Sequence, residues 1–522
     1  MTIMLPAATR SVWTATADIP TPPPLHGSTT ADVCIIGAGI AGLTTAYLLG
    51  RRGKKVIVID DGRISGGETR STTAHLASAI DDRFTEIERL HGEEASRLAA
   101  ESHAAAIDLI EQTVRNELID CQFERLDGYL FGDSSDDNGA LEAEYEAARR
   151  AGLKVEIAPR APLSMFDTGP CLCFANQATF HPLKYLARLV RAIVRDGGRV
   201  YGFTHAKAIE GGDRTAIVEI DSGHTIAADA VVVATNTPIN DRVAIHTKQA
   251  PYTTYAIGCS VPAGAVSKAL YWDLQDPYHY VRVQSDSAPG QLPESELLII
   301  GGEDHKTGQA HDGEERFERL ERWARQRFPI DLDGPRFRWS GQCMETIDGL
   351  AFIGRNPLDK DNVYIATGDS GMGLTHGTIA GMLLTELILG NDHPWRELYD
   401  PSRKTLRALG EFTRENLNTA AEYGAWFTGG DVGSEDEVLP GAGAIVRHGL
   451  RKVAVYRDNE GKLTRLSAIC PHLGGIVTWN AVEHTWDCPC HGTRFQADGH
   501  LIHGPANSGH KPYKPDDKPD GE

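Results

Sequence analysis

The hydrophobic pattern of the first sixty residues predicts a strand, a helix and a second strand. "DVCII" at 32–36 and "KVIVID" at 55–60 are continuous apolar runs typical of buried strands, and the stretch from Gly42 to Leu49 has helical spacing. Two buried strands joined by a helix form a βαβ unit. Residues 1–30, which precede it, are rich in proline and threonine over 18–30, so we expect an extended lead.

The pattern up to residue 405 predicts further helices and two kinds of strand. Helical spacing covers 83–118, 138–152 and 184–196. Alternation of apolar and polar residues predicts strands of an antiparallel sheet at 215–226, 252–260, 279–284 and 336–344. Apolar strands at 227–236, 351–353 and 363–366 precede a helix at 375–389. We therefore expect residues 31–405 to form one α/β unit with interleaved nucleotide-binding and antiparallel-sheet subdomains.

The pattern changes twice near the end of the chain. Residues 406–430 are polar with helical spacing and predict a linker helix. Beyond them, short strands separated by Gly and Asn/Asp turns predict a small all-β domain over 431–515. A chain of 522 residues is too long for one ordinary core, which agrees with several domains. The fold class that follows is α/β plus β.

Composition and charge exclude several classes of partner. Apolar residues make up 41% and charged residues 24%, as in soluble globular proteins. The net charge of −20 argues against nucleic acid and anionic membrane as partners. The longest apolar run, 378–390, carries Glu386 and is too short to span a bilayer, so we expect an amphipathic packed helix. With no secretory signal and nine scattered Cys, a cytoplasmic location is predicted. Whether the chain forms a homo-oligomer is left open.

Glycine spacing in "GAGIAG" at 37–42 predicts a dinucleotide site. Gly37 makes a tight turn, Gly39 lets the backbone approach a pyrophosphate, and Gly42 lets the helix pack close to the sheet. The helix N-terminus offers N–H groups to the phosphates. Asp60 ends the second strand, where it would accept hydrogen bonds from ribose hydroxyls, whereas Asp61 is expected nearer to solvent.

A Cys/His cluster near the end of the chain predicts a metal site. Cys470, His472, Cys488 and His491 form two loops that each supply one Cys and one His. Such ligation suits structural zinc or a Rieske [2Fe–2S] centre, in which one iron takes both Cys and the other both His. The distribution over the loops favours the cluster, and "GPA" at 504–506 stands where a third covering loop is expected.

The two boxes, "CPHLGG" at 470–475 and "CPCHGTRF" at 488–495, resemble those of Rieske domains over 431–512. High-potential members carry a Cys pair joined as a disulfide, but here Cys490 faces Gly475 and cannot form one. Thr493 is expected to donate a hydrogen bond to a sulfur, and Phe495 stands where those members have Tyr. The resemblance therefore implies a potential in the lower part of the range of about −150 to +300 mV.

Four further segments resemble the D-amino-acid oxidase/glycine oxidase superfamily of FAD enzymes, including γ-glutamylputrescine oxidoreductase-like members. They are "GRISGGETRSTTAHLAS" (62–78), "VVVATN" (231–236), "TIDGLAFIGR" (346–355) and "NVYIATGDSGMGLTHG" (362–377), and the resemblance covers about 30–395. It implies FAD as the dinucleotide. The cofactor-binding residues that it and the glycine motif predict are Gly37, Gly39, Ile40, Ala41, Gly42, Asp60, Asp61, Thr69, Ser71, Thr72, Thr73, Ala74, His75, Thr235, Thr367, Gly368, Gly371, Met372, Gly373, Leu374 and Thr375.

The superfamily implies hydride transfer from a carbon beside an amine nitrogen to the flavin, followed by hydrolysis of the imine. The substrate pocket is expected between the FAD-binding part and the antiparallel sheet. Our candidates for its lining are Tyr252, Tyr255, His279, Tyr280, Arg338, Asp348 and His376. Of these and the flavin-loop residues, His376, His75 and Tyr255 are the catalytic candidates.

Joining the two cofactors predicts an FAD-dependent dehydrogenase of a small amine or amino-acid-like molecule, with electrons passed singly through the cluster to an external acceptor. Only one dinucleotide fingerprint is present, so an organic substrate rather than NAD(P)H is expected to reduce the flavin. Two alternatives stay open: electron flow from the cluster to the flavin, or an O₂-using oxidase whose cluster is structural or redox-sensing. A Rieske oxygenase is disfavoured, because His305 and His311 lack the helical spacing of a mononuclear iron site.

Overall fold

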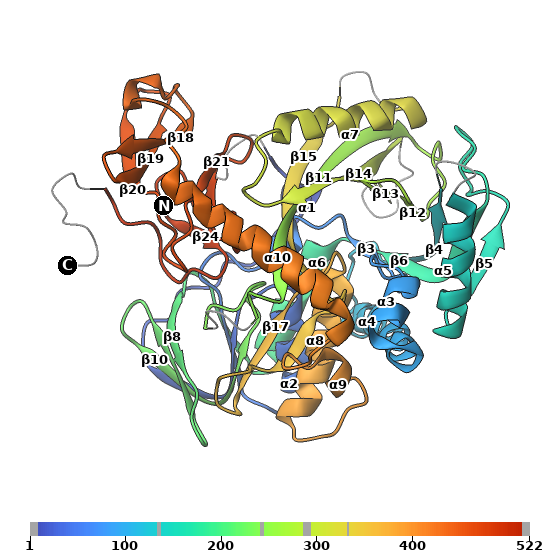
Figure 1. Cartoon of the computed structure of the whole chain (residues 1–522). Helices are drawn as coiled ribbons and strands as arrows, with labels where there is room; N and C mark the ends of the chain where they lie inside the picture. The colour runs from blue at the N-terminus through green and yellow to red at the C-terminus, as the bar shows by residue number, and fades with distance from the viewer. Residues whose placement is uncertain (1–8, 133–136, 241–244, 286–293, 331–333, 514–522) are drawn as a thin grey trace.

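A mostly parallel sheet carries the first βαβ unit in the computed structural model, which describes residues 9–132, 137–240, 245–285, 294–330 and 334–513 (Figure 1). The strand order is β16-β17-β10-β1-β2-β7, with β8 and β9 continuing from β10. The bounds are β1 (Thr29–Ile36), β2 (Val56–Ile59), β7 (Arg199–Tyr201), β8 (Ala206–Glu210), β9 (Ala216–Ile220), β10 (Thr225–Val233), β16 (Phe352–Arg355) and β17 (Val363–Thr367). Helix α2 (Ile40–Arg51) follows β1 directly, as the glycine motif predicts.

One predicted strand lies in a different sheet from the one we expected. The alternation at 215–226 predicts a strand of the antiparallel sheet, but β9 and the start of β10 form a hairpin on the nucleotide-binding sheet. The alternation of this segment reflects its one buried face, since Ala216, Val218 and Ile220 are buried and pack on the same core as β1. Period-two patterning identifies a half-buried strand but not its sheet.

The second sheet is nearly all antiparallel and has the strand order β15-β11-β14-β13-β12-β4-β6-β3, with β5 paired to β6. Its strands are β3 (His75–Leu76), β4 (Glu124–Phe131), β5 (Val155–Ala158), β6 (Cys171–Thr179), β11 (Gln249–Pro262), β12 (Leu270–Asp273), β13 (His279–Ser285), β14 (Ser295–Lys306) and β15 (Phe337–Thr346). Helix α7 (Gly313–Arg327) packs on β11 and β14. The predicted strands correspond to β11, β13 and β15, whereas β3, β4, β5, β6, β12 and β14 are not among the predictions. Strand β14 is apolar over most of its length because both of its faces are covered.

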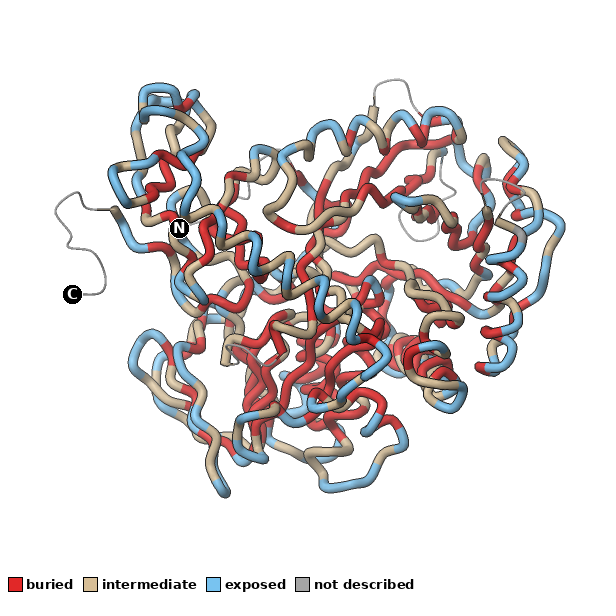
Figure 2. The backbone as a smooth tube through the Cα atoms, viewed as in Figure 1, coloured by how far each residue is buried: buried red, intermediate tan, exposed pale blue. Residues whose placement is uncertain are grey.

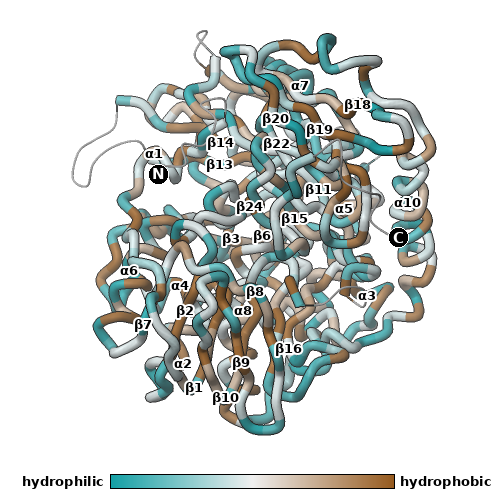
Figure 3. The backbone as a smooth tube through the Cα atoms, turned by 90° about the vertical axis from the view of Figure 1, so that its left-hand side faces the viewer, coloured by the Kyte–Doolittle hydropathy of each residue, from teal (hydrophilic) through white to brown (hydrophobic). Residues whose placement is uncertain are grey.

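Helices enclose the two sheets on several sides. They are α3 (Phe84–His91), α4 (Glu93–Asn116), α5 (Asn138–Arg150), α6 (Pro182–Arg195), α8 (Gly373–Ile388) and α9 (Arg396–Tyr399). Helix α8 is buried around most of its circumference rather than amphipathic as expected, because α2 covers one side and α4 another. A Cβ at Gly381 would lie 2.4 Å from the Thr44 side chain, which shows how closely α8 packs on α2. Figure 2 shows this buried layer, and Figure 3 shows the hydrophobic residues gathered in β1, β2, β10 and α2.

The lead is not wholly extended. A short helix, α1 (Val12–Thr16), precedes the extended residues, and Trp13 on it is fully buried. Its indole Nε1 donates to the Thr72 carbonyl oxygen at 2.6 Å, and the Arg282 guanidinium lies over its ring. The lead therefore closes over the loop that follows β2. The predicted residues 1–8 and 514–515 lie outside the described part of the chain.

The C-terminal part consists of a linker helix and a small β domain. Short helices η3 (Leu406–Ala408) and η4 (Tyr423–Phe427) flank α10 (Leu409–Glu422), which lies along the surface with no buried residue. The β domain has a three-stranded sheet of β18 (Gly443–His448), β19 (Arg451–Arg457) and β20 (Leu463–Ser467). A four-stranded sheet follows with β21 (Thr478–Asn480), β22 (Thr485–Asp487), β23 (Arg494–Gln496) and β24 (Leu501–His503). No helix in the described residues is long and apolar enough to span a bilayer.

Candidate functional site

A cavity of about 1820 Å³ lies between the parallel sheet, the antiparallel sheet and the β domain. This is larger than the roughly 300–1,000 Å³ of an ordinary small-molecule site, so it has room for more than one small ligand. Most of the predicted cofactor residues line it, namely Gly37, Gly39, Ile40, Ala41, Asp60, Asp61, Thr69, Ser71, Thr72, Thr73, His75, Thr235, Thr367, Gly368, Gly371, Met372, Gly373 and Leu374. Segments far apart in the sequence thus meet around one space.

The glycine loop after β1 has the close packing that a pyrophosphate site requires. Gly37 has φ of 102°, and a Cβ there would lie 2.3 Å from the Ala234 carbonyl oxygen. A Cβ at Gly42 would lie 1.9 Å from the Gly37 carbonyl oxygen, so only glycine lets α2 begin at this point. Gly42 supports the loop from behind and does not line the cavity. The N-terminus of α2 consequently opens onto the cavity with its N–H groups available to an anion.

Asp60 is placed at the end of β2 as predicted. Its carboxylate accepts hydrogen bonds from the backbone N–H of Ala38 at 2.7 Å and of Gly62 at 3.0 Å. Burial and the neighbouring Asp61 raise the pKa of Asp60 to about 7. Asp61 lies at the rim, where its carboxylate is 3.7 Å from His205 Nδ1.

The loop after β2 is held by contacts from three parts of the chain. Thr69 Oγ1 accepts from the Ile40 N–H at 3.3 Å, and the Ser71 carbonyl accepts from Trp339 Nε1 at 2.8 Å. Ala74, with φ of 62°, does not line the cavity, and its carbonyl accepts from Arg282 Nη1 at 2.8 Å. These bonds give the loop one conformation along the cavity wall.

The Gly-rich turn before α8 forms the opposite wall. Gly368 and Gly371 have φ of 74° and 69°, a backbone region that side chains disfavour. Helix α8 then points its N-terminus at the cavity, which favours negative charge there. Thr375 does not line the cavity, because its hydroxyl bonds to His103 Nδ1 at 2.8 Å in the core. Two helix N-termini, a glycine cradle and a carboxylate at the end of β2 are the features that fit an FAD.

The three catalytic candidates have different surroundings. His376 is buried, and its Nδ1 donates to the Asp369 carbonyl at 2.9 Å, while Nε2 has no hydrogen-bond partner in the described residues. Burial lowers the pKa of His376 to about 4. His75 lines the cavity, but Val281 O and Thr73 Oγ1 bond its two nitrogens. Burial lowers the pKa of His75 to about 3, with a contribution from Arg282. Both rings are therefore neutral at pH 7, and only His376 has an unoccupied nitrogen.

Tyr255, the third candidate, lies outside the cavity. It is buried between Phe317 and His305, with ring centroids 4.9 and 5.7 Å away. Four other candidates for the substrate pocket, Tyr252, His279, Arg338 and Asp348, also do not line the cavity. His279 bonds Asp273 and stacks on Trp323, which explains its burial without a ligand. Of the seven pocket candidates, Tyr280 and His376 line the cavity.

The antiparallel sheet brings an acidic and aromatic group to the cavity that sequence reasoning missed. The Tyr278 hydroxyl lies 3.0 Å from Asp81 Oδ2 and 3.3 Å from Asp304 Oδ2. Thr254 bonds the Tyr280 hydroxyl at 2.6 Å. Burial raises the pKa of Asp304 to about 7. The sequence signal for this group is weak, because Asp81, Tyr278 and Asp304 lie in three separate segments and form no motif. The predicted Tyr280, two residues from Tyr278, is the nearest indication of it.

The predicted metal ligands come together in pairs of like type. The Cys470 and Cys488 thiols hydrogen-bond each other, and the rings of His472 and His491 have centroids 5.0 Å apart. No three His, Cys, Asp or Glu side chains in the described residues converge as ligands of a single ion. A sulfur pair beside an imidazole pair is the donor set of a Rieske [2Fe–2S] centre, so the residues fit that cluster.

The residues around the ligands differ from those of high-potential Rieske domains in the way the sequence predicts. A Cβ at Gly475 would lie 2.6 Å from Cys490 Sγ, so these positions face each other and no disulfide forms there. Thr493 is fully buried, and its hydroxyl hydrogen-bonds Cys470. Phe495 is fully buried against His510, at 4.0 Å between ring centroids. One hydroxyl therefore reaches the sulfurs from Thr493, and Phe495 offers none.

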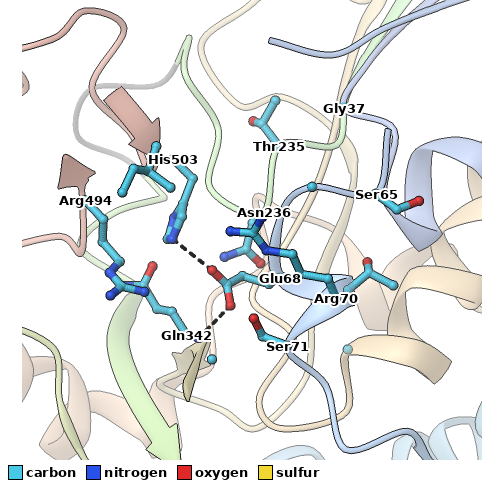
Figure 4. A pocket seen from close by; sticks show the side chains of 18 of the residues that line it. Gly37, Ser65, Glu68, Arg70, Ser71, Thr235, Asn236, Gln342, Arg494 and His503 are labelled. Atoms are coloured by element: carbon cyan, nitrogen blue, oxygen red, sulfur yellow. Dashed lines mark hydrogen bonds and ion pairs between the residues drawn. The ribbon is translucent and has the colours of Figure 1, made fainter. Parts of the chain in front are cut away.

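The β domain sits directly on the cavity of the same chain (Figure 4). Glu68, on the loop after β2, forms an ion pair with His503 at 2.8 Å and accepts from the Gln342 N–H at 2.7 Å. Although burial alone would raise it, the charge and hydrogen bond of His503, with Arg494, lower the pKa of Glu68 to about 2. Arg494 and His503 line the cavity, so this wall belongs to the β domain.

Comparison with known proteins agrees with both sites. The FAD dependent oxidoreductase family (DAO) matches residues 32–387, and the Rieske [2Fe-2S] domain matches 430–514. The putative Rieske 2Fe-2S iron-sulfur protein YhfW of Bacillus subtilis is 32% identical over 501 residues, 96% of this chain and 96% of that protein. Gamma-glutamylputrescine oxidoreductase of Escherichia coli is 27% identical over 381 residues, 70% of this chain and 85% of that protein.

A solved structure is similar in fold. Glycine oxidase from Geobacillus kaustophilus superposes with a TM-score of 0.59 and 18% identity, over 72% of this chain and 99% of that one. The α/β fold with its antiparallel sheet and the C-terminal β domain are thereby confirmed, as are FAD and a [2Fe–2S] cluster as cofactors. The chain belongs to the DAO family of FAD dependent oxidoreductases and carries a Rieske domain at its C-terminal end.

Proposed function

We propose that the chain is an FAD-dependent dehydrogenase that oxidises a small amine or amino-acid-like molecule and passes the electrons singly through its Rieske cluster to an external acceptor. The observation that carries the proposal is the seating of the cluster loops on the flavin domain of the same chain. Gln342 Nε2 donates to the Gly492 carbonyl at 3.1 Å, and Gln309 Nε2 to the Pro489 carbonyl at 3.3 Å. Close seating suits exchange of electrons within one molecule.

The linker fixes this seating from the other side. Trp426 Nε1 donates to the Gly474 carbonyl at 2.9 Å, and the Tyr423 hydroxyl to the Leu473 carbonyl at 2.9 Å. On α10, Glu415 pairs with Lys306 of the antiparallel sheet at 2.6 Å. The linker therefore contacts the first cluster loop and the flavin domain together.

The cavity supports an amine as the substrate. Asp81 and Asp304 place carboxylates beside Tyr278, and carboxylates attract a protonated amine. When bound, the flavin accepts a hydride from the carbon beside the amine nitrogen, and the cluster accepts one electron at a time. The His376 ring borders the same cavity as an uncharged group, because burial lowers its pKa to about 4. The relationship to gamma-glutamylputrescine oxidoreductase supports the same class of substrate.

An anaerobic titration with a panel of amines and amino acids tests the proposal. Purified protein with both cofactors is mixed with each compound, and flavin absorbance and the EPR signal of the reduced cluster are recorded. We expect a hit to bleach the flavin and then reduce the cluster. Bleaching without cluster reduction, followed by peroxide when air is admitted, would identify an oxidase. Reduction of the flavin only after electrons are supplied to the cluster would identify reverse flow.

A further inference from the structure

Gln342, at the centre of β15, touches the flavin cavity and the second cluster loop with one side chain. It is 3% exposed and lines the cavity. Its Nε2 donates to the Gly492 carbonyl at 3.1 Å and to Thr307 Oγ1 at 3.2 Å, and Gly492 follows the ligand His491. Its Oε1 is buried without a hydrogen-bond partner in the described residues. An amide oxygen buried without a donor costs free energy, and the amide keeps this orientation because Gly492 and Thr307 accept from its Nε2.

The packing around this contact is tight. A Cβ at Gly492 would lie 2.5 Å from Pro251 Cβ and 2.7 Å from Gln342 Nε2. Thus Gly492 allows the ligand loop to touch β11 and β15 without an intervening side chain. Gln342 therefore connects the cavity wall to the second cluster loop through one side chain and one hydrogen bond.

His246 makes a second contact between the domains at the cluster. It belongs to the flavin domain, ahead of β11, and is 3% exposed. Its ring centroid lies 4.8 Å from that of His472 and 5.7 Å from that of His491, edge to face in both cases. The linker holds this segment, because Asn416 Nδ2 donates to the carbonyl of the next residue, Thr247, at 2.9 Å. A flavin-domain imidazole therefore packs against both histidine ligands.

We propose that Gln342 and His246 form the contact through which electrons pass from the flavin to the histidine side of the cluster within one chain. Gln342 bridges the cofactor cavity and the loop of His491, and His246 positions the two ligand rings. The inference rests on the proposed function for its direction. The hydride brings the flavin two electrons and one proton. Each transfer would remove one electron and convert one ferric ion of the cluster to ferrous, and the proton would leave to solvent once both electrons are gone. A one-electron acceptor restores the ferric ion before the second transfer.

Photoreduction tests the contact without knowledge of the substrate. In full-length protein with both cofactors, a light flash with EDTA reduces the flavin, and the cluster absorbance then reports the arrival of the electron. The variants are Gln342→Leu, His246→Ala and His246→Phe. Gln342→Leu removes the side-chain amide and with it the hydrogen bond to the Gly492 carbonyl. Gln309→Leu is the matched control, because Gln309 also bonds the second cluster loop but does not line the cavity.

We expect the wild-type transfer rate to be independent of protein concentration. Relative to it, Gln342→Leu should slow transfer at least tenfold, the scale of outer-shell changes at metal sites, whereas Gln309→Leu should stay within about twofold. His246→Ala should slow transfer and change the EPR g values of the dithionite-reduced cluster, and His246→Phe should restore part of the rate. Iron and sulfide content and visible circular dichroism confirm that each variant holds its cluster.

Two results would overturn the inference. One is a Gln342→Leu rate equal to that of Gln309→Leu, and the other is a wild-type rate that rises in proportion to protein concentration. Failure of the proposed function looks different, since no amine would then reduce either centre while transfer after the flash stayed rapid and sensitive to Gln342.

Discussion

Thr493 links a single hydroxyl to the electronic properties of the cluster. The hydroxyl hydrogen-bonds Cys470 and also accepts from the Ala506 N–H at 3.3 Å. Hydrogen bonds to sulfur stabilise the reduced cluster and so raise its potential. We predict that Thr493→Val lowers the potential by about 40–90 mV, which corresponds to about 1–2 kcal/mol for one hydrogen bond. A redox titration followed by EPR measures the shift.

Thr493→Ser is the control for shape, because it keeps the hydroxyl and loses only a methyl group. Its potential should remain near that of the wild type. Equal potentials in the Val variant and the wild type would show that the hydroxyl does not act on the sulfurs.

We expect the Asp304 carboxylate to bind the protonated amine of the substrate in the cavity. Because burial raises its pKa to about 7, the carboxyl becomes charged as the pH rises through that value. We predict that kcat/KM for a protonated amine rises across this range and that Asp304→Asn loses the rise. The variant should also lose about 10–100-fold in kcat/KM above pH 8, from about 1.5–3 kcal/mol for a hydrogen bond to a charged group.

Steady-state kinetics from pH 6 to pH 9 decide this prediction. Asp213→Asn is the matched control, since Asp213 is 91% exposed in the turn between β8 and β9 and does not line the cavity. A pH profile of Asp304→Asn that overlays the wild-type profile would mean that another group controls binding.

At the scale of elements, Asp348 joins the turn after β15 to the segment after α9. Arg403 binds its two oxygens at 2.7 and 2.9 Å, and the Thr405 hydroxyl bonds it at 2.6 Å. We predict that Asp348→Asn costs about 3–5 kcal/mol of unfolding free energy, because Arg403 is left buried without its partner. Denaturant unfolding measures this loss, and KM should not change since Asp348 does not line the cavity.

The pH dependence of this element follows from the same pair. Burial alone would raise the pKa of Asp348, but the charge and hydrogen bonds of Arg403 lower it to about 2. A depressed carboxyl pKa contributes stability above the unfolded value near 4 and loses it as the pH falls toward 2. The gap in Tm between wild type and Asp348→Asn should therefore narrow below pH 4. Asp361→Asn, which breaks an exposed pair with Arg355, should cost less than about 1 kcal/mol at any pH.

Helices and strands could be predicted where they depend on a local residue pattern, but not where packing against other elements determines their place. Helix α2 and strands β1 and β2 follow from periodicity and glycine spacing over thirty contiguous residues. The prediction placed the hairpin of β9 and β10 in the wrong sheet, because the alternation of apolar and polar residues does not show which strand a segment pairs with. Helix α8 was expected to be amphipathic, yet it is covered on several sides by α2 and α4, which its own sequence does not reveal.

At the scale of the whole molecule, the ion pair of Glu68 and His503 ties the β domain to the flavin loop. We predict that His503→Leu weakens FAD binding at least tenfold, about 1.4 kcal/mol, because Glu68 keeps the Gln342 N–H but loses its ion-pair partner while buried on the loop that lines the cavity. FAD fluorescence on dilution measures the release. His500→Leu, a 77% exposed histidine of the same domain, is the control and should bind FAD as the wild type does. Equal affinities in both variants would contradict a role for the ion pair.

The sequence by itself determined the cofactors, the loops that hold them and the division into a flavin part and a Rieske part. Those features depend on short motifs in which the chemistry and the local backbone are set by neighbours in the chain. Only the tertiary structure decided what surrounds the substrate and how the cluster faces the flavin. Tyr278 meets Asp81 across 197 positions and Gln342 meets Gly492 across 150, and no local pattern records such contacts. They arise from sheet order and domain seating, which are set by packing of the whole chain.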